Sequence, residues 1–553
     1  MAQRNIFLPS LLTCLLGLLL TWECETREPA LDHWRPPGKL QHAFVQTAGC
    51  VPSDRIDSFF QYPQYRMRQP RPETGWDTWD TMWLCNMLDS SVRASGVNFE
   101  HVAEGQTVNT FPGVYIETNN KINFCRHIHR AFPESHGVSF HMPCFVLPED
   151  GALLRSNLRE KQNFAERRWV TKPEAGSGGK GLQLFSSAQL LQIIDQVEQR
   201  AIRVYVQEYL HKTLLLDYDR NLAPPSPGKV TGSSVPTLSA LRVKFDFRVY
   251  FAITSMRPLR VWVHRYGFSR LATKEFSLKG DHARDLQRHV ANVDFQKRQK
   301  EFRAPQSNGD DCSAAERSLE CVMKEIAVKT GKSVGDVWLA ICNVLGKTGL
   351  AVQQSIANKA RCKGCYQFWG ADVVFDDEGN PFMLEINSSP SISFQMMITE
   401  GTGLISIYPD LWRLKGVDPL VERANCNLKN ISKWIDPHKT HPNGLFRSWL
   451  LMESKPSGAD METISRMVTE LRNRGGFDLG WPTRSAVTAR LDRERSTGSC
   501  KADGIRLGEQ HENANPEQSD GSHLLSLRDA SLYEVFFLLA EQPEKDLLHA
   551  SCF

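Results

Sequence analysis

The sequence lacks a charge imbalance. Its 553 residues carry 66 Lys and Arg against 63 Asp and Glu, which gives a formal net charge of +3. A chain without a strong field of one sign is not typical of a nucleic-acid-binding protein, and an acidic substrate must then be bound by a local cluster of cations. We therefore expect no nucleic-acid partner.

Several motifs of common enzyme classes are also missing. The chain has no HExxH, no Gly-x-Ser-x-Gly elbow and no GxxxxGK[ST] loop, which argues against a zinc protease, a serine hydrolase of the α/β type and a P-loop enzyme. Its 14 cysteines are scattered, and the CxxC from Cys362 to Cys365 has no second Cys or His pair nearby. That pair is therefore interpreted as structural rather than as a metal or redox site.

Long hydrophobic runs are scarce. One sixteen-residue run, at residues 7–22, follows Arg4 and precedes an acidic stretch. This order is typical of a signal peptide or a membrane anchor, so residues 1–30 predict membrane association or entry into the secretory pathway. The alternative is an apolar helix that docks on the body of the protein.

The length allows about three to four domains. Strand-like and helix-like segments alternate, which predicts an α+β fold. After the N-terminal segment we expect four regions: an N-terminal α/β domain at 40–160, a central domain with a glycine loop at 161–280, a C-terminal domain with a polar hairpin at 317–438, and a weakly structured extension at 440–553.

The clearest pattern lies between Leu241 and Ile253. Every odd position is apolar, whereas the even positions include Lys244, Asp246 and Arg248. A period of two predicts a β-strand with one face in a core. The charged face is interpreted as a ligand-binding surface, with a solvated ladder of ion pairs as the alternative.

A second pattern predicts a β-hairpin from Gly370 to Asn387, with a turn at residues 377–380. Antiparallel pairing then sets Asp372 opposite Glu385, and Asn387 follows on the same face. Three oxygen donors would converge there, a set that suits Mg²⁺ better than zinc. The apolar residues Phe382, Leu384 and Ile386 are expected to face the core; a local cap or salt bridge at Glu385 is the alternative.

A glycine-rich loop between Lys172 and Gly181 adds a third element. Its glycines let backbone N–H groups approach phosphate oxygens, and Lys172 and Lys180 supply cations. The following strand, Val206 to Leu210, offers backbone groups to an adenine edge. Together the three elements predict a nucleotide cleft between two sheets.

The order of these segments, WVTKP, GGKG, VQEYL, KFDFRVY, FWGADVVFD and PFMLEINSSPS, resembles the tubulin–tyrosine ligase-like family. TVNTFPGVY and FVLPED resemble N-terminal landmarks of that family. The resemblance covers about residues 105–415. It implies an ATP-grasp fold, with the nucleotide cleft between two sheet-containing subdomains, and an enzyme that uses ATP and Mg²⁺ to join amino acids to tubulin.

The resemblance also implies roles for residues. Arg248 and Arg270 would face the reacting groups, and Asp372, Glu385 and Asn387 would hold Mg²⁺. Lys180 is the nearest cation to Gly178, where many members carry Arg, and Ala291 stands where a Thr is usual. The nucleotide-binding residues would be Lys172, Lys180, Gln207, Glu208, Tyr209, Leu210, Lys244, Asp246 and Asn292.

The function expected from the resemblance is an ATP-dependent ligase that adds an amino acid, glutamate first, to tubulin or microtubules through an acyl phosphate. The chain would act as a monomer with a free amino acid as co-substrate. Glycylation and tyrosination stay open. So do an inactive nucleotide- or microtubule-binding adaptor and a ligase for a non-tubulin protein. The family places the protein in the cytoplasm or on the cytoskeleton, in conflict with the N-terminal run.

Overall fold

The computed structural model describes the following residues, with isolated positions besides: 41–46, 65–68, 79–84, 97–102, 106–133, 140–160, 164–173, 181–200, 202–218, 240–302, 314–359, 364–390, 458–483 and 485–491.

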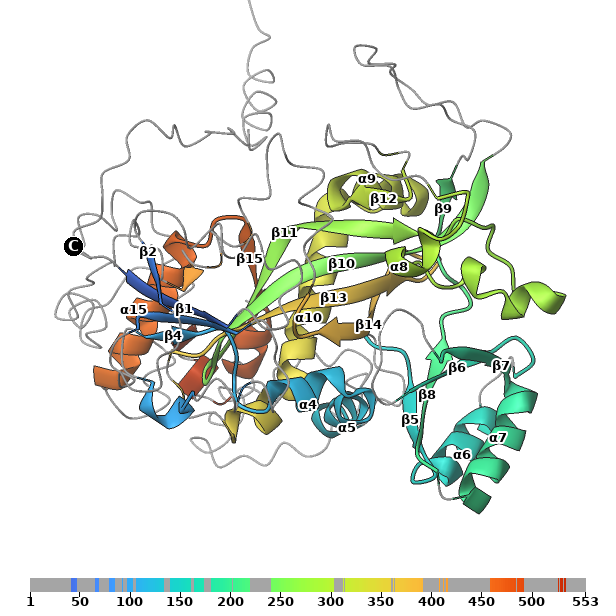
Figure 1. Ribbon diagram of the computed structural model, residues 1–553, viewed down its shortest axis with the longest axis horizontal. Helices are drawn as coiled ribbons and strands as arrows, with labels where there is room; N and C mark the ends of the chain where they lie inside the picture. The colour runs from blue at the N-terminus through green and yellow to red at the C-terminus, as the bar shows by residue number, and fades with distance from the viewer. Residues whose placement is uncertain are drawn as a thin grey trace, which may run out of the picture. The chain divides into compact units, whose positions relative to one another are not determined.

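A large antiparallel sheet forms the centre of this part of the chain (Figure 1). Its strands run in the order β12-β11-β10-β13-β14, and β9 and β15 add to β10 and β11. The bounds are β9 Leu215–Tyr218, β10 Leu241–Met256, β11 Leu259–Leu271, β12 Glu316–Ser318, β13 Gln367–Phe375, β14 Pro381–Asn387 and β15 Phe477–Trp481. The predicted central and C-terminal domains thus share one sheet, because β10 and β11 pair with strands on both sides.

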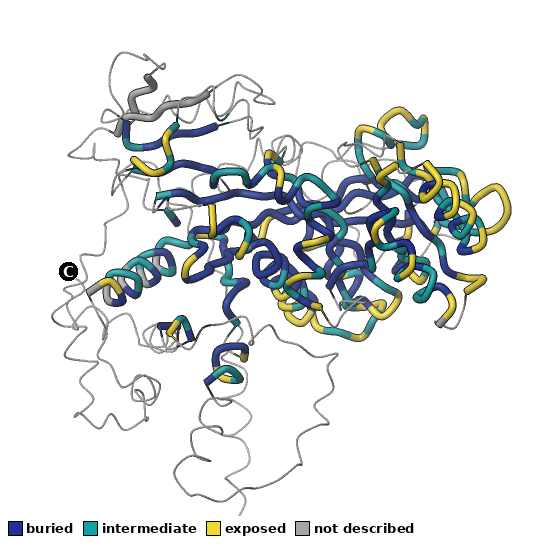
Figure 2. Tube along the Cα trace, turned by 90° about the horizontal axis from the view of Figure 1, so that it is seen from below, coloured by how far each residue is buried: buried dark blue, intermediate teal, exposed yellow. Residues whose placement is uncertain are grey.

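The alternating pattern predicted strand β10 correctly, but both of its faces are buried. Buried residues, dark blue in Figure 2, make up much of the described part of the chain. The odd apolar positions belong to the main hydrophobic core. Lys244, Asp246 and Arg248 on the other face are 7%, 7% and 8% exposed. A solvated ladder is therefore excluded, because these charges are buried beneath other parts of the protein.

Two helices cover the apolar face of the sheet, α9 (Leu319–Thr330) and α10 (Val334–Ala357). The long helix α10 was not predicted, although Ser333 and Asp336 form a capping box at its start. It packs closely on the sheet at Gly346, where an added Cβ would lie 2.3 Å from the carbonyl oxygen of Gly480. Because α9 and α10 cover the apolar face of the sheet, the opposite, polar face of β10 is available to form a binding site.

The hairpin of β13 and β14 has the predicted register, with Asp372 opposite Glu385. Asp376 accepts hydrogen bonds from the backbone N–H groups of Glu378 (3.1 Å) and Asn380 (2.7 Å), which fixes the turn. A bulge follows Asp372 and makes Leu384 the extra residue. The expected alternation is therefore wrong before the bulge. Ile386 lies in the core as predicted, but Met383 takes the place expected for Phe382. Leu384 lines a cavity.

A smaller antiparallel sheet, ordered β5-β8-β6-β7, lies beside the large one. Two helices pack on it, α6 (Gly151–Glu160) and α7 (Ser187–Arg200) (Figure 1). The strands are β5 Cys144–Leu147, β6 Arg168–Lys172, β7 Gln183–Ser186 and β8 Val204–Tyr209. Ser186 caps α7, because its hydroxyl accepts from the N–H of Gln189 (3.3 Å), and Ser187 is the first residue of the helix. Ser187 instead accepts from the indole of Trp169.

The N-terminal region contains a parallel sheet of order β2-β1-β3-β4. Its strands are β1 Gln41–Gln46, β2 Tyr65–Arg68, β3 Thr81–Leu84 and β4 Thr107–Val108. Helices α4 (Val114–Asn119) and α5 (Lys121–Ala131) follow, and both contact α10. Asn120 caps α5 by accepting from the N–H groups of Ile122 and Asn123.

Part of the region expected to be weakly structured is folded. Residues 458–472 form helix α15 (Gly458–Arg472), and β15 pairs with β11. Glu470 of α15 is buried against the sheet, where Arg260 donates to it at 2.7 and 2.9 Å. Thr254 and Trp262 donate to the same carboxylate. This network of polar contacts fastens α15 to β10 and β11.

The localisation predicted from the N-terminal run is wrong. In the part of the chain that the structure describes, no helix has the length and apolar character needed to span a bilayer. The run itself, residues 7–22, lies outside the described residues.

We expect Glu470→Ala to lower the free energy of unfolding by about 3–5 kcal/mol, because it leaves the buried Arg260 without a counter-charge. Urea unfolding of the full chain measures this change. Glu462→Ala is the control, since Glu462 lies on the same helix in a half-exposed pair with Arg466 and is expected to cost less than about 1 kcal/mol. Equal losses in the two variants would contradict the role of Glu470.

Candidate active site

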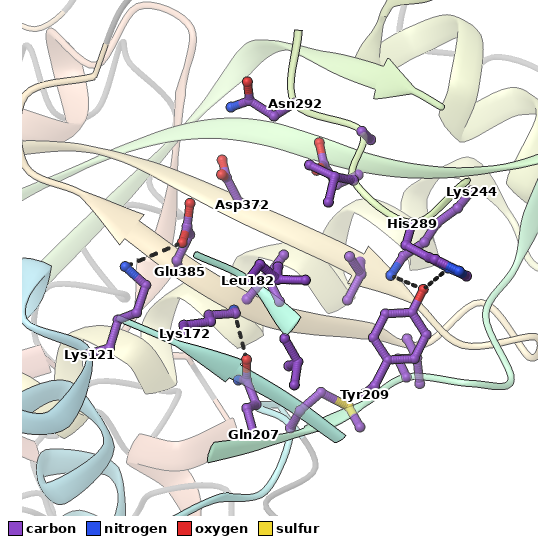
Figure 3. Close-up of a pocket in the computed structure, with 18 of the residues that line it drawn as sticks. Lys121, Lys172, Leu182, Gln207, Tyr209, Lys244, His289, Asn292, Asp372 and Glu385 are labelled. Carbon is purple, nitrogen blue, oxygen red and sulfur yellow. Dashed lines mark hydrogen bonds and ion pairs between the residues drawn. The ribbon is translucent and has the colours of Figure 1, made fainter. Parts of the chain in front are cut away.

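A cavity lies between the small sheet and the large sheet (Figure 3). Strands β6 and β8 supply one wall, and β10, β11, β13 and β14 supply the other. Helix α5 and the segment 289–292 close the edges. The polar and charged residues that line it are Lys121, Lys172, Gln207, Glu208, Tyr209, Lys244, Asp246, Arg270, His289, Asn292, Asp372 and Glu385.

Lys172 projects from β6 into this cavity and donates to the side-chain oxygen of Gln207 at 2.9 Å. The same amide of Gln207 lies 3.2 Å from Nε2 of the buried His141. Burial lowers the pKa of Lys172 to about 8, and the neighbouring Glu385 only partly opposes this shift. A negatively charged group bound beside Lys172 would therefore raise its pKa and stabilise the charged ammonium form.

Lys244 reaches the cavity from β10 and donates to the hydroxyl of Tyr209 at 2.9 Å. Its ammonium group lies 4.0 Å from the centre of the same ring, and Tyr209 Oη lies 3.1 Å from Nδ1 of His289. Burial lowers the pKa of Lys244 to about 7, although Asp246 raises it. Burial likewise lowers the pKa of His289 to about 4, which keeps that imidazole neutral.

Four charged side chains form a buried ion cluster, which we define as Asp246, Arg248, Arg270 and Asp372. Arg248 Nε donates to Asp372 Oδ1 at 2.6 Å, and Arg270 Nη2 lies 2.9 Å from Asp372 Oδ2. Arg270 Nε also donates to Asp246 at 2.6 Å. Burial raises the pKa of Asp372, but the two guanidinium groups more than offset it and hold that pKa well below its usual range.

Glu385 faces Asp372 across the hairpin and extends toward the cavity (Figure 3). Its carboxylate is 4.0 Å from the ammonium group of Lys121, at the start of α5. Asn387 lies two residues further, and its side-chain nitrogen is buried without a hydrogen-bond partner among the described residues. The hairpin end therefore presents carboxylate and amide groups that the local structure does not fully satisfy.

Two lining residues have side chains that are already engaged. Arg167 donates to both oxygens of Glu208 at 2.8 Å, so this carboxylate is paired away from any ligand. Asn292 accepts from the N–H of Asp294 at 3.0 Å and caps α8 (Val293–Gln296). A ligand in the cavity would therefore contact mainly the parts of Glu208 and Asn292 that these hydrogen bonds do not use.

Most of the predicted site residues come together in the cavity. Three do not line it: Arg248 acts from behind through Asp372, Asn387 lies beside the hairpin end, and Lys180 is outside the described residues. Gly370 makes room for Arg248, because an added Cβ would lie 3.0 Å from its Cδ and 2.8 Å from the Pro390 side chain.

Lys121 and the side chain of His289 line the cavity, although neither was predicted from the sequence as a site residue. Only one feature of the sequence indicated Lys121: it is a cation at the start of a helix that follows the Thr110-Phe111-Pro112-Gly113 segment. His289 stands in the segment His289 to Asn292, where Val290 and Ala291 also line the cavity.

Comparison with known proteins adds independent information. Residues 99–400 match the model of the tubulin-tyrosine ligase family. The tubulin monoglutamylase TTLL4 of Mus musculus is 26% identical over 303 residues, which cover 53% of this chain and 22% of the relative. The tubulin polyglutamylase ttll-11 of Caenorhabditis elegans is 26% identical, with 56% and 41% covered. The tubulin polyglutamylase TTLL6 of Mus musculus is 24% identical, with 82% and 49% covered.

The matches span less than half of the length of each of these relatives. The family model nevertheless covers more than half of this chain, and it includes both sheets of the cavity from β5 to β14. The chain belongs to the tubulin-tyrosine ligase family.

Proposed function

We propose that this chain is an ATP- and Mg²⁺-dependent ligase of the ATP-grasp type that adds an amino acid, most simply glutamate, to tubulin. The observation that carries this proposal is the convergence of Lys172 and Lys244, from two different sheets, with the carboxylates of Asp372 and Glu385 in one cavity. Glutamate and tubulin are inferred from the relatives, which are named tubulin monoglutamylase and polyglutamylase.

The residues at the hairpin end fit Mg²⁺. Asp372 is ionised, the side chain of Glu385 is 32% exposed toward the cavity, and Asn387, the last residue of β14, has an amide oxygen at the same end of the hairpin. These are hard oxygen donors that leave room for phosphate oxygens, as Mg²⁺ prefers. Bound there, the ion would neutralise charge on the transferred phosphoryl group. Arg248 and Arg270 hold the Asp372 carboxylate in place for this role.

The nucleotide phosphates would lie between Lys172 and Lys244. Both ammonium groups are buried and have lowered pKa values, so a polyanion would stabilise their charged forms. The adenine would then lie along β8, where residues 207–210 line the cavity. Tyr209 and His289 keep Lys244 pointed at this space.

The reaction needs two steps. A carboxylate oxygen of the acceptor attacks the γ-phosphorus, the bond to ADP breaks, and an acyl phosphate forms. The amine of the incoming amino acid then attacks the acyl carbon, phosphate leaves, and the amine loses a proton. The cations of the cavity offset the charge on the phosphoryl oxygens, so the protein contributes positioning and electrostatic stabilisation. An inactive adaptor is disfavoured because none of the three residues proposed to hold Mg²⁺, Asp372, Glu385 and Asn387, is replaced.

We expect Glu385→Gln to reduce ligation on the order of a hundredfold or more, because it removes one anionic ligand from the metal site. Incorporation of labelled glutamate into tubulin, with ATP and Mg²⁺, measures this loss in the full chain. Glu378→Gln is the matched control, an exposed Glu in the turn of the same hairpin. Equal incorporation by Glu385→Gln and the native chain would refute the metal role. Absence of incorporation of any amino acid by the native chain would refute the function.

We also expect ATP binding to take up protons at pH 8. Lys244 is then mostly neutral in the free protein, since burial lowers its pKa to about 7, and the bound phosphates raise that pKa again. Affinity should therefore fall as pH rises above 7. Calorimetry in two buffers of different ionisation enthalpy measures the uptake.

Lys244→Arg should reduce this proton uptake, because arginine stays charged at pH 8. Lys324→Arg is the control, on the exposed surface of α9. Unchanged uptake in Lys244→Arg would contradict the assignment.

A further inference from the structure

Two cysteines and a histidine form a compact cluster outside the cavity, which we call the Cys125–His129–Cys144 cluster. Cys125 and His129 lie on α5, and Cys144 is the first residue of β5. The two cysteines are joined as a disulfide with their Cα atoms 6.0 Å apart. His129 Nε2 is 3.8 Å from each sulfur atom. Both cysteines are buried, and His129 is half-buried.

The histidine has no part in forming a disulfide, yet it is equally distant from both sulfurs. Residues four apart on a helix share one face, so Cys125 and His129 project toward the same point on β5. In a tetrahedral zinc site, Zn–S bonds of about 2.3 Å and Zn–N bonds of about 2.0 Å set the sulfur–nitrogen distance at roughly 3.5 Å. The distances here are close to that value.

We propose that the reduced form of this cluster binds one Zn²⁺ ion. A thiol reductant supplies two electrons and two protons to open the disulfide into two thiols. Zn²⁺ then displaces both thiol protons and is bound by two thiolates and His129 Nε2. Rotation of the two cysteine side chains separates the sulfurs without moving the Cα atoms. Water takes the fourth position on the half-exposed side of His129.

The choice of ion follows from the donors. Two thiolates and one imidazole favour zinc over Mg²⁺ or Ca²⁺, which prefer oxygen ligands. Within the described residues, no other group of three His, Cys, Asp or Glu side chains gathers in this way. Cys362 and Cys365 also form a disulfide, but they are not joined by a third ligand in such a group.

The cluster adjoins the cavity at its α5 edge and at its β8 wall. Cys125 is one helical turn from Lys121, which pairs with Glu385, and Cys144 is paired with Gln207 of β8. The disulfide and the zinc-bound dithiolate would each hold α5 against β5, close to the lining residues Lys121 and Gln207. The site is therefore structural, and its existence does not depend on which reaction the cavity performs.

Titration of the reduced full chain with Co²⁺, a spectroscopic substitute for Zn²⁺, tests the proposal. We expect one equivalent to bind, with sulfur-to-cobalt charge-transfer absorption and the visible bands of a tetrahedral site, and to be displaced by Zn²⁺. The oxidised chain should bind none. His129→Asn should weaken binding on the order of tenfold or more while leaving the disulfide able to form.

His129→Cys should keep the metal, because a thiolate replaces the imidazole as a ligand. Cys362→Ser is the control and should bind Co²⁺ like the native chain. The proposal is overturned if the reduced native chain shows no charge-transfer band. It is also overturned if His129→Asn binds Co²⁺ as tightly as the native chain, or if Cys362→Ser abolishes binding.

Discussion

The ionised carboxylate of Asp372, held between Arg248 and Arg270, is the interaction on which the site depends. A buried carboxylate with one unpaired side would be protonated or destabilising, so two guanidinium groups must arrive from β10 and β11 in the correct register. Such clusters rarely add stability over an apolar core. In this protein the cluster nevertheless lies at the cavity, where it supplies the fixed negative charge of Asp372.

This requirement explains much of the large sheet. The strand that carries Lys244, Asp246 and Arg248 has an apolar opposite face. Helices α9 and α10 cover that apolar face, so the hydrophobic core forms there and the charged face remains available to line the cavity. Gly370 is part of the same solution, since a side chain there would collide with Arg248. The small sheet then closes the cavity from the other side with Lys172 and Gln207.

Features with a local period could be predicted from the sequence, whereas features set by tertiary packing could not. The alternation in β10 and the turn of the hairpin fixed the strands and the pairing of Asp372 with Glu385. The bulge at Leu384 could not be predicted, because it changes the face without changing the residue types. Lys121 and Glu470 were missed for a related reason: each reaches its partner only when distant segments meet.

The charge balance of the cavity points to the kind of ligand it takes. Asp246, Arg248, Arg270 and Asp372 largely neutralise one another, so their carboxylates offset the burial of Lys172 and Lys244 only in part. Burial consequently lowers the pKa of both lysines, and each carries its charge only in part near pH 8. A neutral ligand would leave that cost unrelieved, whereas a polyanion between the two sheets would restore both charges. The buried lysines of the cavity thus favour a ligand with several adjacent negative charges over a neutral one.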